Sequence, residues 1–198
     1  MPNESATSPD ERQTASQAEE KVWTPLFMLI GASALLFFMA GMGLNTGSSV
    51  YLARIGSPSW VAGVSAASFS VAAAIMRIIS GKMIDVWSRY VVVAVGSILF
   101  VVVTVAPLAH LGNEAFLVIR IVQGIAFAMV TTTLATMASD VLPLSRLGEG
   151  LGFHGLSQAI AMSVGPAIAL FLVETDPAEN LFVAIGILAA CACVLCLQ

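Results

Sequence analysis

Long apolar runs alternate with short polar breaks along most of the chain, and this pattern predicts membrane-spanning helices. A helix needs about 20 apolar residues to cross a hydrocarbon core of roughly 30 Å. The expected spans are residues 25–49, 59–80, 90–109, 115–138, 150–173 and 181–198. The last run has only 17 residues before Gln198, which is marginal for crossing, so we expect the sixth helix to be truncated.

Composition supports the same class of protein. Hydrophobic residues make up 58% of the chain, charged residues 10%, and the mean hydropathy is +0.93, whereas soluble domains carry about 25% charged residues. We therefore expect an all-α membrane protein in which six short-looped spans leave no room for a separate soluble domain. The formal net charge of -4 and the lack of a basic cluster exclude nucleic-acid binding, which needs a concentrated Lys and Arg surface.

The first 22 residues differ from the rest of the chain. They are rich in Ser, Thr, Glu, Gln and Asp and show no apolar periodicity, so we expect residues 1–22 to be a disordered tail and residues 23–198 to be the transmembrane domain. The tail lacks a basic n-region, and the apolar run that follows is too long for the core of a signal peptide.

The distribution of basic residues predicts the orientation, because short cytoplasmic loops accumulate Lys and Arg. With the tail inside, the opposite loops hold only Arg54 among basic residues, together with acidic ones. We therefore expect a multi-pass protein of the cell membrane with a cytoplasmic N-terminus. The basic residues on the tail side would be Arg12, Lys21, Lys82, Arg89 and Arg146, with Arg77 just within the membrane.

Three cysteines lie in the last apolar run with the spacing C-x-C-x-x-C. On a helix Cys191 and Cys193 point to nearly opposite faces, so these two thiolates and that of Cys196 cannot converge on one ion. A buried free cysteine behaves as a small hydrophobic side chain. We expect neither a metal site nor a cofactor.

The charged stretch of residues 77–89 lies between two strongly apolar runs, so we expect it to form the turn of a transmembrane hairpin. It resembles the loop between the second and third helices of the major facilitator superfamily, Gly-x-Leu-x-Asp-Arg-x-Gly-Arg. Val86 and Ser88 replace the first Arg and the second Gly of that pattern, and an ordinary positive-inside loop is the alternative. The matching positions are Gly81, Asp85 and Arg89.

The polar segment after the fourth run carries a related cue. Asp140, followed by Arg146-Leu-Gly-Glu149-Gly, resembles the acidic end of helix four and the Arg- and Gly-rich start of helix five in the superfamily. Arg89 and Asp140 both close helix ends at one membrane surface, so they are candidates for a charge pair that locks one conformation. The resemblance implies a conformational gate made of Arg77, Gly81, Asp85, Arg89 and Asp140.

The fourth run contains ionisable and polar residues within an apolar helix. Arg120-Ile-Val-Gln123-Gly124 resembles the Arg-x-x-Gln-Gly motif of helix four in the superfamily, and these three residues share one helical face with Phe127 and Thr131. An intramembrane Arg costs about 2.5 to 3.5 kcal/mol on insertion scales and is a functional candidate. The alternative is that Arg120 snorkels to the nearby membrane interface.

The fifth run contains a third match. Residues 161–166, Ala-Met-Ser-Val-Gly-Pro, resemble the Gly-x-x-x-Gly-Pro motif of the antiporter branches of the superfamily, although Ala161 replaces the leading Gly. Pro166 removes a backbone donor, and Gly165 beside it makes a helix bend tolerable. A kinked packing helix without antiport is the alternative.

Other polar positions share faces of the predicted helices. Asn45 lies on one face of the first helix with Gly41 and Ser48, and His154 and Gln158 lie four residues apart on the fifth. They are candidates for proton or substrate contacts, and hydrogen bonding between packed helices is the alternative. A Ser157–His154 hydrolytic pair has no nucleophile elbow around it, so we expect no catalytic residues and no enzyme.

The resemblance implies the N-terminal half of a transporter, six helices arranged as two inverted three-helix repeats, which works by alternating access. We expect proton-coupled efflux of a small molecule, with a second six-helix half as partner in the lipid bilayer. The alternative is a membrane subunit or inert fragment that transports nothing by itself. The expected substrate or proton pathway comprises Arg120, Gln123, Asn45, His154 and Gln158.

Overall fold

The computed structural model describes residues 22–109, 112–175 and 177–197, without the side chain of Asp85, and within these residues all regular structure is helical. The predicted tail therefore lies outside the described residues except for Val22, which is buried rather than solvated. Two short 3-10 helices, η1 (Ala106–Ala109) and η2 (Leu144–Arg146), flank longer elements. The α-helices are α2 (Pro25–Arg54), α3 (Ser59–Val86), α4 (Arg89–Val105), α5 (Asn113–Asp140), α6 (Leu147–Glu174) and α7 (Asn180–Cys196).

The ends of α2 show how local sequence sets the helix boundaries. The Thr24 hydroxyl accepts a hydrogen bond of 3.2 Å from the backbone N–H of Phe27, and Pro25 occupies the first turn, where a missing N–H costs nothing. At the other end Gly56 has a φ of 77°, a left-handed conformation that glycine adopts without strain. Thr24 and Pro25 thus start the helix, and Gly56 allows the chain to turn away just after its last residue, Arg54.

The predicted hairpin turn at residues 77–89 is mostly helical, which corrects the prediction. Helix α3 continues through Val86, and the chain reverses at Trp87 and Ser88, whose backbones are extended. Apolar residues recur at helical spacing through Ile84, so the charged side chains interrupt the apolar run without ending the helix. The turn itself needs only two residues.

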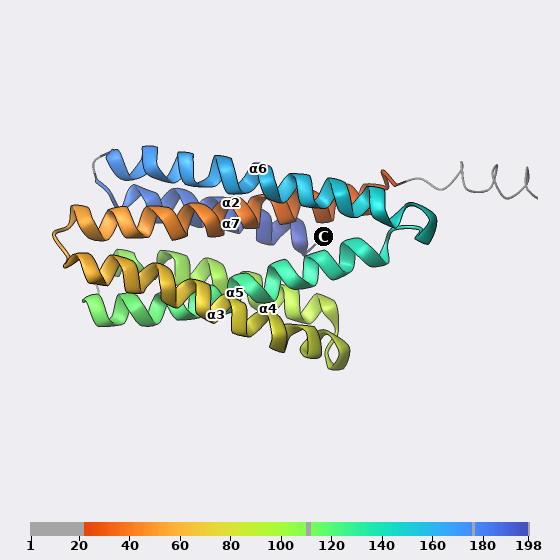
Figure 1. Cartoon of the computed structure of the whole chain (residues 1–198), viewed down its shortest axis with the longest axis horizontal. Coiled ribbons are helices and arrows are strands. Elements are labelled where there is room, and N and C mark those ends of the chain that lie inside the picture. The colour runs from red at the N-terminus through yellow and green to blue at the C-terminus, as the bar shows by residue number, and fades with distance from the viewer. Residues whose placement is uncertain (1–21, 110–111, 176, 198) are drawn as a thin grey trace, which may run out of the picture.

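The helices run alternately up and down along one axis, so the chain turns at two ends of an elongated bundle (Figure 1). We call the end where α2 begins the Pro25 end and the opposite end the Arg54 end. The most extensive packing joins α2 to α6 and α3 to α5, which are not consecutive in the chain. Helix α4 also packs against α5, α7 packs against α2, and α4 and α7 contact each other.

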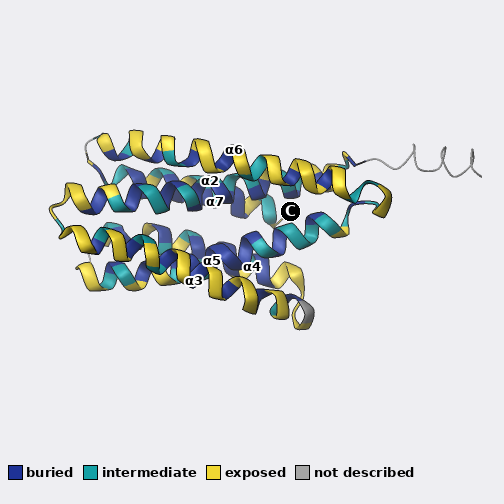
Figure 2. Ribbon diagram, in the orientation of Figure 1, coloured by how far each residue is buried: buried dark blue, intermediate teal, exposed yellow. Residues whose placement is uncertain are grey.

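Burial differs strongly among the helices. In their most apolar windows α5 is 61% buried and α2 50% buried, whereas α3 and α6 are only 28% and 22% buried. Figure 2 shows the exposed residues along α6 and α3, at opposite sides of the bundle. Among the described residues, five helices are long and apolar enough to cross a membrane, which supports an all-α membrane protein; α7, with 17 residues, is shorter than this.

Candidate functional site

A hydrogen-bonded cluster around Arg120 lies in the interior of the bundle. The Arg120 Nη1 group donates to Gln123 Oε1 at 2.7 Å, and Nη2 donates to Asn45 Oδ1 at 2.6 Å. The Gln123 amide in turn donates to the Val103 carbonyl at 3.2 Å. The guanidinium carbon lies 4.6 Å from the centroid of the Phe69 ring, a cation–π distance. Arg120 thus contacts α2 and α3 from α5, and Gln123 extends the cluster to α4.

The environment of Arg120 is unusual for a charged side chain. Its side chain is fully buried, so the alternative in which it snorkels to the membrane interface does not hold. Among the residues that the structure describes, no carboxylate lies within ion-pair distance of this guanidinium, and its Nε–H has no hydrogen-bond partner. Neutral amide oxygens therefore provide the hydrogen bonds that partly offset the desolvation of a full positive charge.

Gly124 allows the α3 and α5 backbones to meet beside this cluster. A Cβ atom built at Gly124 would lie 2.3 Å from the Phe69 carbonyl oxygen and 3.1 Å from Ala72 Cβ. Because a backbone carbonyl cannot move aside as a flexible side chain can, any larger residue here would push the two helices apart. The glycine thus keeps the Phe69 ring within reach of Arg120.

A cavity of about 500 Å³, which we call the polar cavity because half of its lining residues carry polar side chains, lies between α2, α3, α5 and α6. Thr131, the first α5 residue that lines it, lies 11 positions after Arg120. This corresponds to about 16 Å along the helix axis toward the Pro25 end. Its apolar wall comes mainly from α2 and α6, and its polar groups come from three different helices. The lining residues are Phe38, Met42, Arg77, Thr131, Thr132, Ala135, Gln158 and Met162.

The structure therefore places the predicted pathway residues in separate locations. Gln158 lines this polar cavity, whereas Asn45 and Gln123 surround Arg120. Arg77, predicted at the gate, is exposed and also lines the cavity. Thr132 also lines the cavity and was not among the predicted residues, although three consecutive threonines at 131–133 inside an apolar helix were the available signal.

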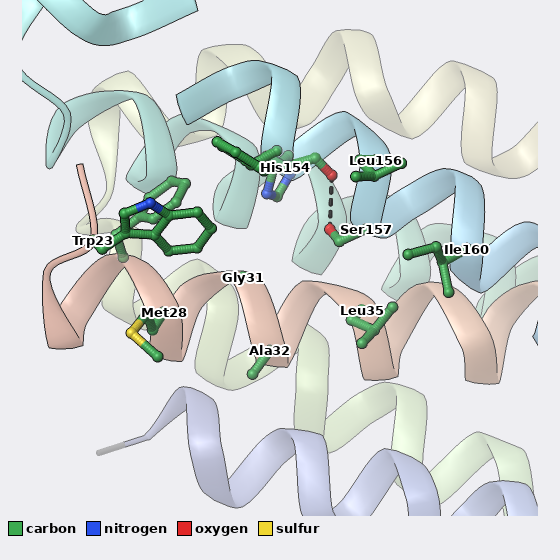
Figure 3. Close-up of a pocket in the computed structure, with 11 residues that line it drawn as sticks. Trp23, Met28, Gly31, Ala32, Leu35, His154, Leu156, Ser157 and Ile160 are labelled. Carbon is green, nitrogen blue, oxygen red and sulfur yellow. Dashed lines mark hydrogen bonds between the residues drawn. The ribbon is translucent and has the colours of Figure 1, made fainter. Parts of the chain in front are cut away.

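His154 and Gln158 lie on neighbouring positions of α6 but contribute to different cavities. His154 lines a second, mostly apolar cavity between α2 and α6, and its side chain is buried. The Ser157 hydroxyl donates to the backbone carbonyl of His154 at 2.7 Å rather than to its imidazole (Figure 3). The hydroxyl is therefore not arranged as a nucleophile activated by that ring.

The predicted gate residues lie at or near the Pro25 end. Arg89, at the start of α4, forms an ion pair with Asp140, at the end of α5, and both side chains are partly exposed. Gly81 faces open space, since a Cβ atom built there would meet no atom within 4 Å. The side chain of Asp85 lies outside the described residues. The structure thus brings Arg89 and Asp140 together and leaves their role as a gate a prediction.

Gly165 lies at the closest approach of α6 to α2. A Cβ atom built at Gly165 would lie 2.6 Å from the Met39 carbonyl oxygen, and one built at Gly43 would lie 2.8 Å from the Gly165 carbonyl oxygen. Pro166 sits inside α6, which continues as a helix from Leu147 to Glu174. The predicted helix bend at Gly165 and Pro166 therefore coincides with a backbone-to-backbone contact between two helices.

The cysteines of α7 lie in different surroundings. Cys191 is exposed, Cys196 is partly buried, and buried Cys193 donates from Sγ to Ser97 Oγ at 3.3 Å. Within the described part of the chain, no three His, Cys, Asp or Glu side chains gather as a metal site would require.

Comparison with known proteins gives a consistent result. The sequence model of the protein family described as Major Facilitator Superfamily matches residues 26–198 of this chain. The chain is 21% identical over 173 residues, 87% of its length, to the Probable actinorhodin transporter of Streptomyces coelicolor. It is 25% identical over 146 residues, 73% of its length, to the Staphylopine export protein of Staphylococcus aureus. It is 24% identical over 147 residues, 74% of its length, to an uncharacterized MFS-type transporter of Methanocaldococcus jannaschii. The matched regions cover 30%, 36% and 38% of these relatives, so the chain spans about a third of their length.

Proposed function

The chain belongs to the major facilitator superfamily, and from this membership we propose that it forms the N-terminal half of a transporter that moves a small molecule across the membrane by alternating access. The observation that carries the proposal is the polar cavity of about 500 Å³. Four helices contribute to it, and Arg77, Thr131, Thr132 and Gln158 give it hydrogen-bonding groups within otherwise apolar helices. A second half facing these helices would close the cavity around a substrate.

The internal packing supports an arrangement of two inverted three-helix repeats, α2–α4 and α5–α7. Exchanging α2 with α5, α3 with α6 and α4 with α7 turns the α2–α6 contact into the α5–α3 contact, and these are the two most extensive contacts. The same exchange relates Gly43, which faces the Gly165 carbonyl, to Gly124, which faces the Phe69 carbonyl. In each repeat, therefore, a glycine of the first helix packs against a backbone carbonyl of the second helix of the other repeat.

The Arg120 cluster is proposed to sense occupancy of the pathway. A guanidinium that is held by Asn45 and Gln123 without a fixed carboxylate responds strongly to any charge that approaches it, because the interior screens charge poorly. We propose that protons are the coupling ion and that transport is outward. Two similarities support this: the antiporter-like stretch that ends at Gly165 and Pro166, and the export function in the name of the Staphylococcus aureus relative.

The ion pair between Arg89 and Asp140 is proposed to act in the gate at the cytoplasmic surface. It joins the start of α4 to the end of α5 at the end of the bundle where α2 begins. The distribution of Lys and Arg supports a cell-membrane protein with this end inside. Asp85, Gly81 and Arg77 belong to the same proposal through the loop motif.

Transport by everted vesicles tests the proposal in the complete transporter. Vesicles would be offered a compound panel that includes actinorhodin and staphylopine, with and without an imposed pH gradient. We expect Arg120→Ala to lower gradient-driven uptake at least about tenfold, because its interactions are worth at least about 1.4 kcal/mol at the transition between states. We expect Asp85→Asn to slow uptake as well.

A matched control lies on α6. Ser163 is exposed and its hydroxyl bonds only to the carbonyl of Ala159, at 3.2 Å, so Ser163→Ala should transport at the unmodified rate. Unchanged uptake in both Arg120→Ala and Asp85→Asn would contradict the proposed roles. Uptake that ignores the pH gradient while both variants fail would contradict proton coupling alone.

One observation favours the alternative, a membrane subunit that does not transport by itself. In the apolar windows of α3 and α6 only 28% and 22% of the residues are buried, so the described helices supply one wall of a pathway. Reading the coding sequence downstream of Gln198 separates the two possibilities: a frame that encodes further spans supports a single transporter, and a stop followed by a separate partner gene supports a subunit.

A further inference from the structure

A second cavity, of about 300 Å³, lies between α2 and α6 near the Pro25 end (Figure 3). Its walls come from Trp23, just before α2, and from the two helices. Gly31 and Leu35 line it from α2, and Leu156 and Ile160 line it from α6. His154 and Ser157 are the polar side chains among its lining residues. It is separate from the polar cavity described above.

This cavity opens on the outer flank of the bundle. Along α6 the buried line that packs inward runs through His154, Ala161 and Gly165. Ile160, which lines this cavity, and Gln158, which lines the polar cavity, lie on opposite sides of that line. None of the lining residues belongs to α3, α4 or α5. The cavity therefore faces away from the proposed pathway.

The cavity lies beside the apolar part of α6, beyond the charged first turn that contains Glu149. His154 lies seven residues after the start of α6, or about 10 Å along the helix axis. Met28 and Leu156, on the rim, are both 56% exposed, and both are apolar. A molecule dissolved in the lipid would therefore meet an apolar rim and could enter without crossing polar groups.

His154 is an unused hydrogen-bonding group inside this cavity. Its side chain is 5% exposed, and neither ring nitrogen has a hydrogen-bond partner among the described residues. Leaving a buried polar group unpaired costs about 1–3 kcal/mol. The Ser157 hydroxyl does not satisfy it, because that hydroxyl donates to the backbone carbonyl of residue 154. A ligand with one hydroxyl group would supply a partner for one of these two nitrogens.

Aromatic side chains form the end wall of the cavity. The Trp23 ring lies 4.7 Å from the Phe153 ring and 6.2 Å from the Phe27 ring, measured between centroids. Aromatic rings pack favourably against such walls through stacked or edge-on contacts. An apolar cavity of about 150 Å³ holds one benzene molecule, so a cavity twice as large accommodates one or two rings together with a small polar group.

We propose that this cavity is a bilayer-facing binding site for a one- or two-ring aromatic molecule that carries a hydroxyl group. The hydroxyl bonds to the His154 imidazole, and the ring lies against Trp23 and Phe153. The site is distinct from the proposed substrate pathway and does not depend on transport. It also gives His154 a role that differs from the one predicted for it beside Gln158.

Fluorescence quenching tests the proposal in the full-length protein in lipid nanodiscs, with every tryptophan except Trp23 replaced by Phe. The probes are 4-bromophenol and bromobenzene, whose bromine quenches tryptophan only at contact. With concentrations expressed as mole fraction in the lipid, we expect 4-bromophenol to quench Trp23 saturably. Its half-saturating concentration should be about 3- to 10-fold below that of bromobenzene, the effect of one hydrogen bond.

Two variants and one control define the site. His154→Phe should remove the preference for 4-bromophenol. Gly31→Leu should abolish saturable quenching by both probes, because a Cβ atom at Gly31 meets nothing within 4 Å and the side chain would fill the cavity without disturbing helix packing. Ser163→Ala, on the same helix but outside the cavity, should bind as the unmodified protein does.

Three results would overturn the proposal. Quenching that rises linearly and equally in the unmodified and Gly31→Leu proteins would mean that the probes only partition into lipid. Equal affinity for both probes would remove the role of His154. Absence of quenching by either probe would mean that another part of the protein covers the cavity.

Discussion

Arg120 combines full burial with hydrogen bonds to amide oxygens alone. Removing an arginine from water costs several kcal/mol even after the protein relaxes, and the contacts to Asn45, Gln123 and the Phe69 ring offset only part of that cost. The buried guanidinium therefore destabilises the fold if either amide acceptor is lost. The cluster therefore makes the packing of four helices depend on two amide side chains.

The Asn45 amide tests this dependence. We expect Asn45→Ala to lower the free energy of unfolding by about 1–3 kcal/mol, because Nη2 of Arg120 loses its acceptor in the interior. Asn45→Asp should retain most of the stability, because the carboxylate still accepts the bond. The measurement is the thermal unfolding midpoint in detergent, followed by size-exclusion chromatography.

Ser70→Ala provides the comparison. Ser70 is exposed on α3, and its hydroxyl bonds to the Ala66 carbonyl of its own helix at 3.0 Å. This variant should unfold within about 0.5 kcal/mol of the unmodified protein. If Asn45→Ala behaves in the same way, the amide does not support the buried charge.

Sequence patterns predicted part of this site. Helical spacing correctly placed Arg120 and Gln123 on one face, because the periodicity of a single helix follows from its sequence. The contact of Arg120 with Asn45 was not predictable, since spacing within one helix does not tell which other helix faces it. Likewise His154 and Gln158, four residues apart, were expected to act together. The rotation of about 40° between these positions around the α6 axis is enough to place them in different cavities.

At the scale of helices, the number and approximate position of the elements followed from the apolar runs. Four helices, α2, α3, α5 and α6, extend beyond their predicted spans, mostly into polar sequence, as with α3 through Val86, whereas α4 and α7 begin only one residue early. Charged residues near a membrane surface can remain helical because their backbone groups bond within the helix while their side chains reach water. Hydropathy alone therefore underestimates the length of these helices.

Glycine positions provide a test of helix contacts. We expect Gly124→Ala to destabilise the protein by about 1–3 kcal/mol, because its Cβ would lie 2.3 Å from the Phe69 carbonyl oxygen and force α3 away from α5. Gly155→Ala, on an open face of α6, should instead stabilise it by about 0.5–1 kcal/mol. Thermal unfolding of the two single variants measures the difference.

The opposite signs of these two effects make the comparison decisive. Both variants add the same methyl group to a helix interior and remove the same backbone freedom from the unfolded chain. A similar shift for both would show that α3 and α5 do not meet at Gly124.

At the scale of the whole molecule, the exposed apolar surfaces of α3 and α6 need a partner. Ile78 on α3 and Met162 on α6 are 73% and 57% exposed, and lipid or a second polypeptide surface must cover them. The proposed second half would lie against these two helices, because they border the polar cavity on either side.

Cross-linking of the chain expressed alone in membranes tests this expectation. In a background without native cysteines, Ile78→Cys and Met162→Cys should form cross-linked dimers with a short bifunctional reagent, since an uncovered pathway wall would pair with a second copy. Val194→Cys, exposed on α7, should react with a monofunctional label but not cross-link. A monomer with no cross-link from any of the three positions would remove the case for a paired surface.

The arrangement of the helices was less predictable than their existence. Short loops imply that consecutive helices are antiparallel neighbours, yet the most extensive contacts join α2 to α6 and α3 to α5. Those pairs depend on glycines and carbonyls in distant segments, such as Gly43 with Gly165, and neither segment alone specifies its partner. The resemblance to a family, rather than periodicity, suggested the paired repeats.

The contact between α2 and α6 has a mechanical consequence. The two helices are joined at three heights: Trp23 with Phe153 near one end, Gly43 with Gly165 in the middle, and Arg54, which donates to the Val173 carbonyl, at the other. Sliding of one helix along the other would disrupt all three contacts together, so we expect α2 and α6 to move as one rigid unit. The cavity beside Gly31 lies between the first two of these contacts, so we expect the packing on either side of it to keep it open when the rest of the bundle moves.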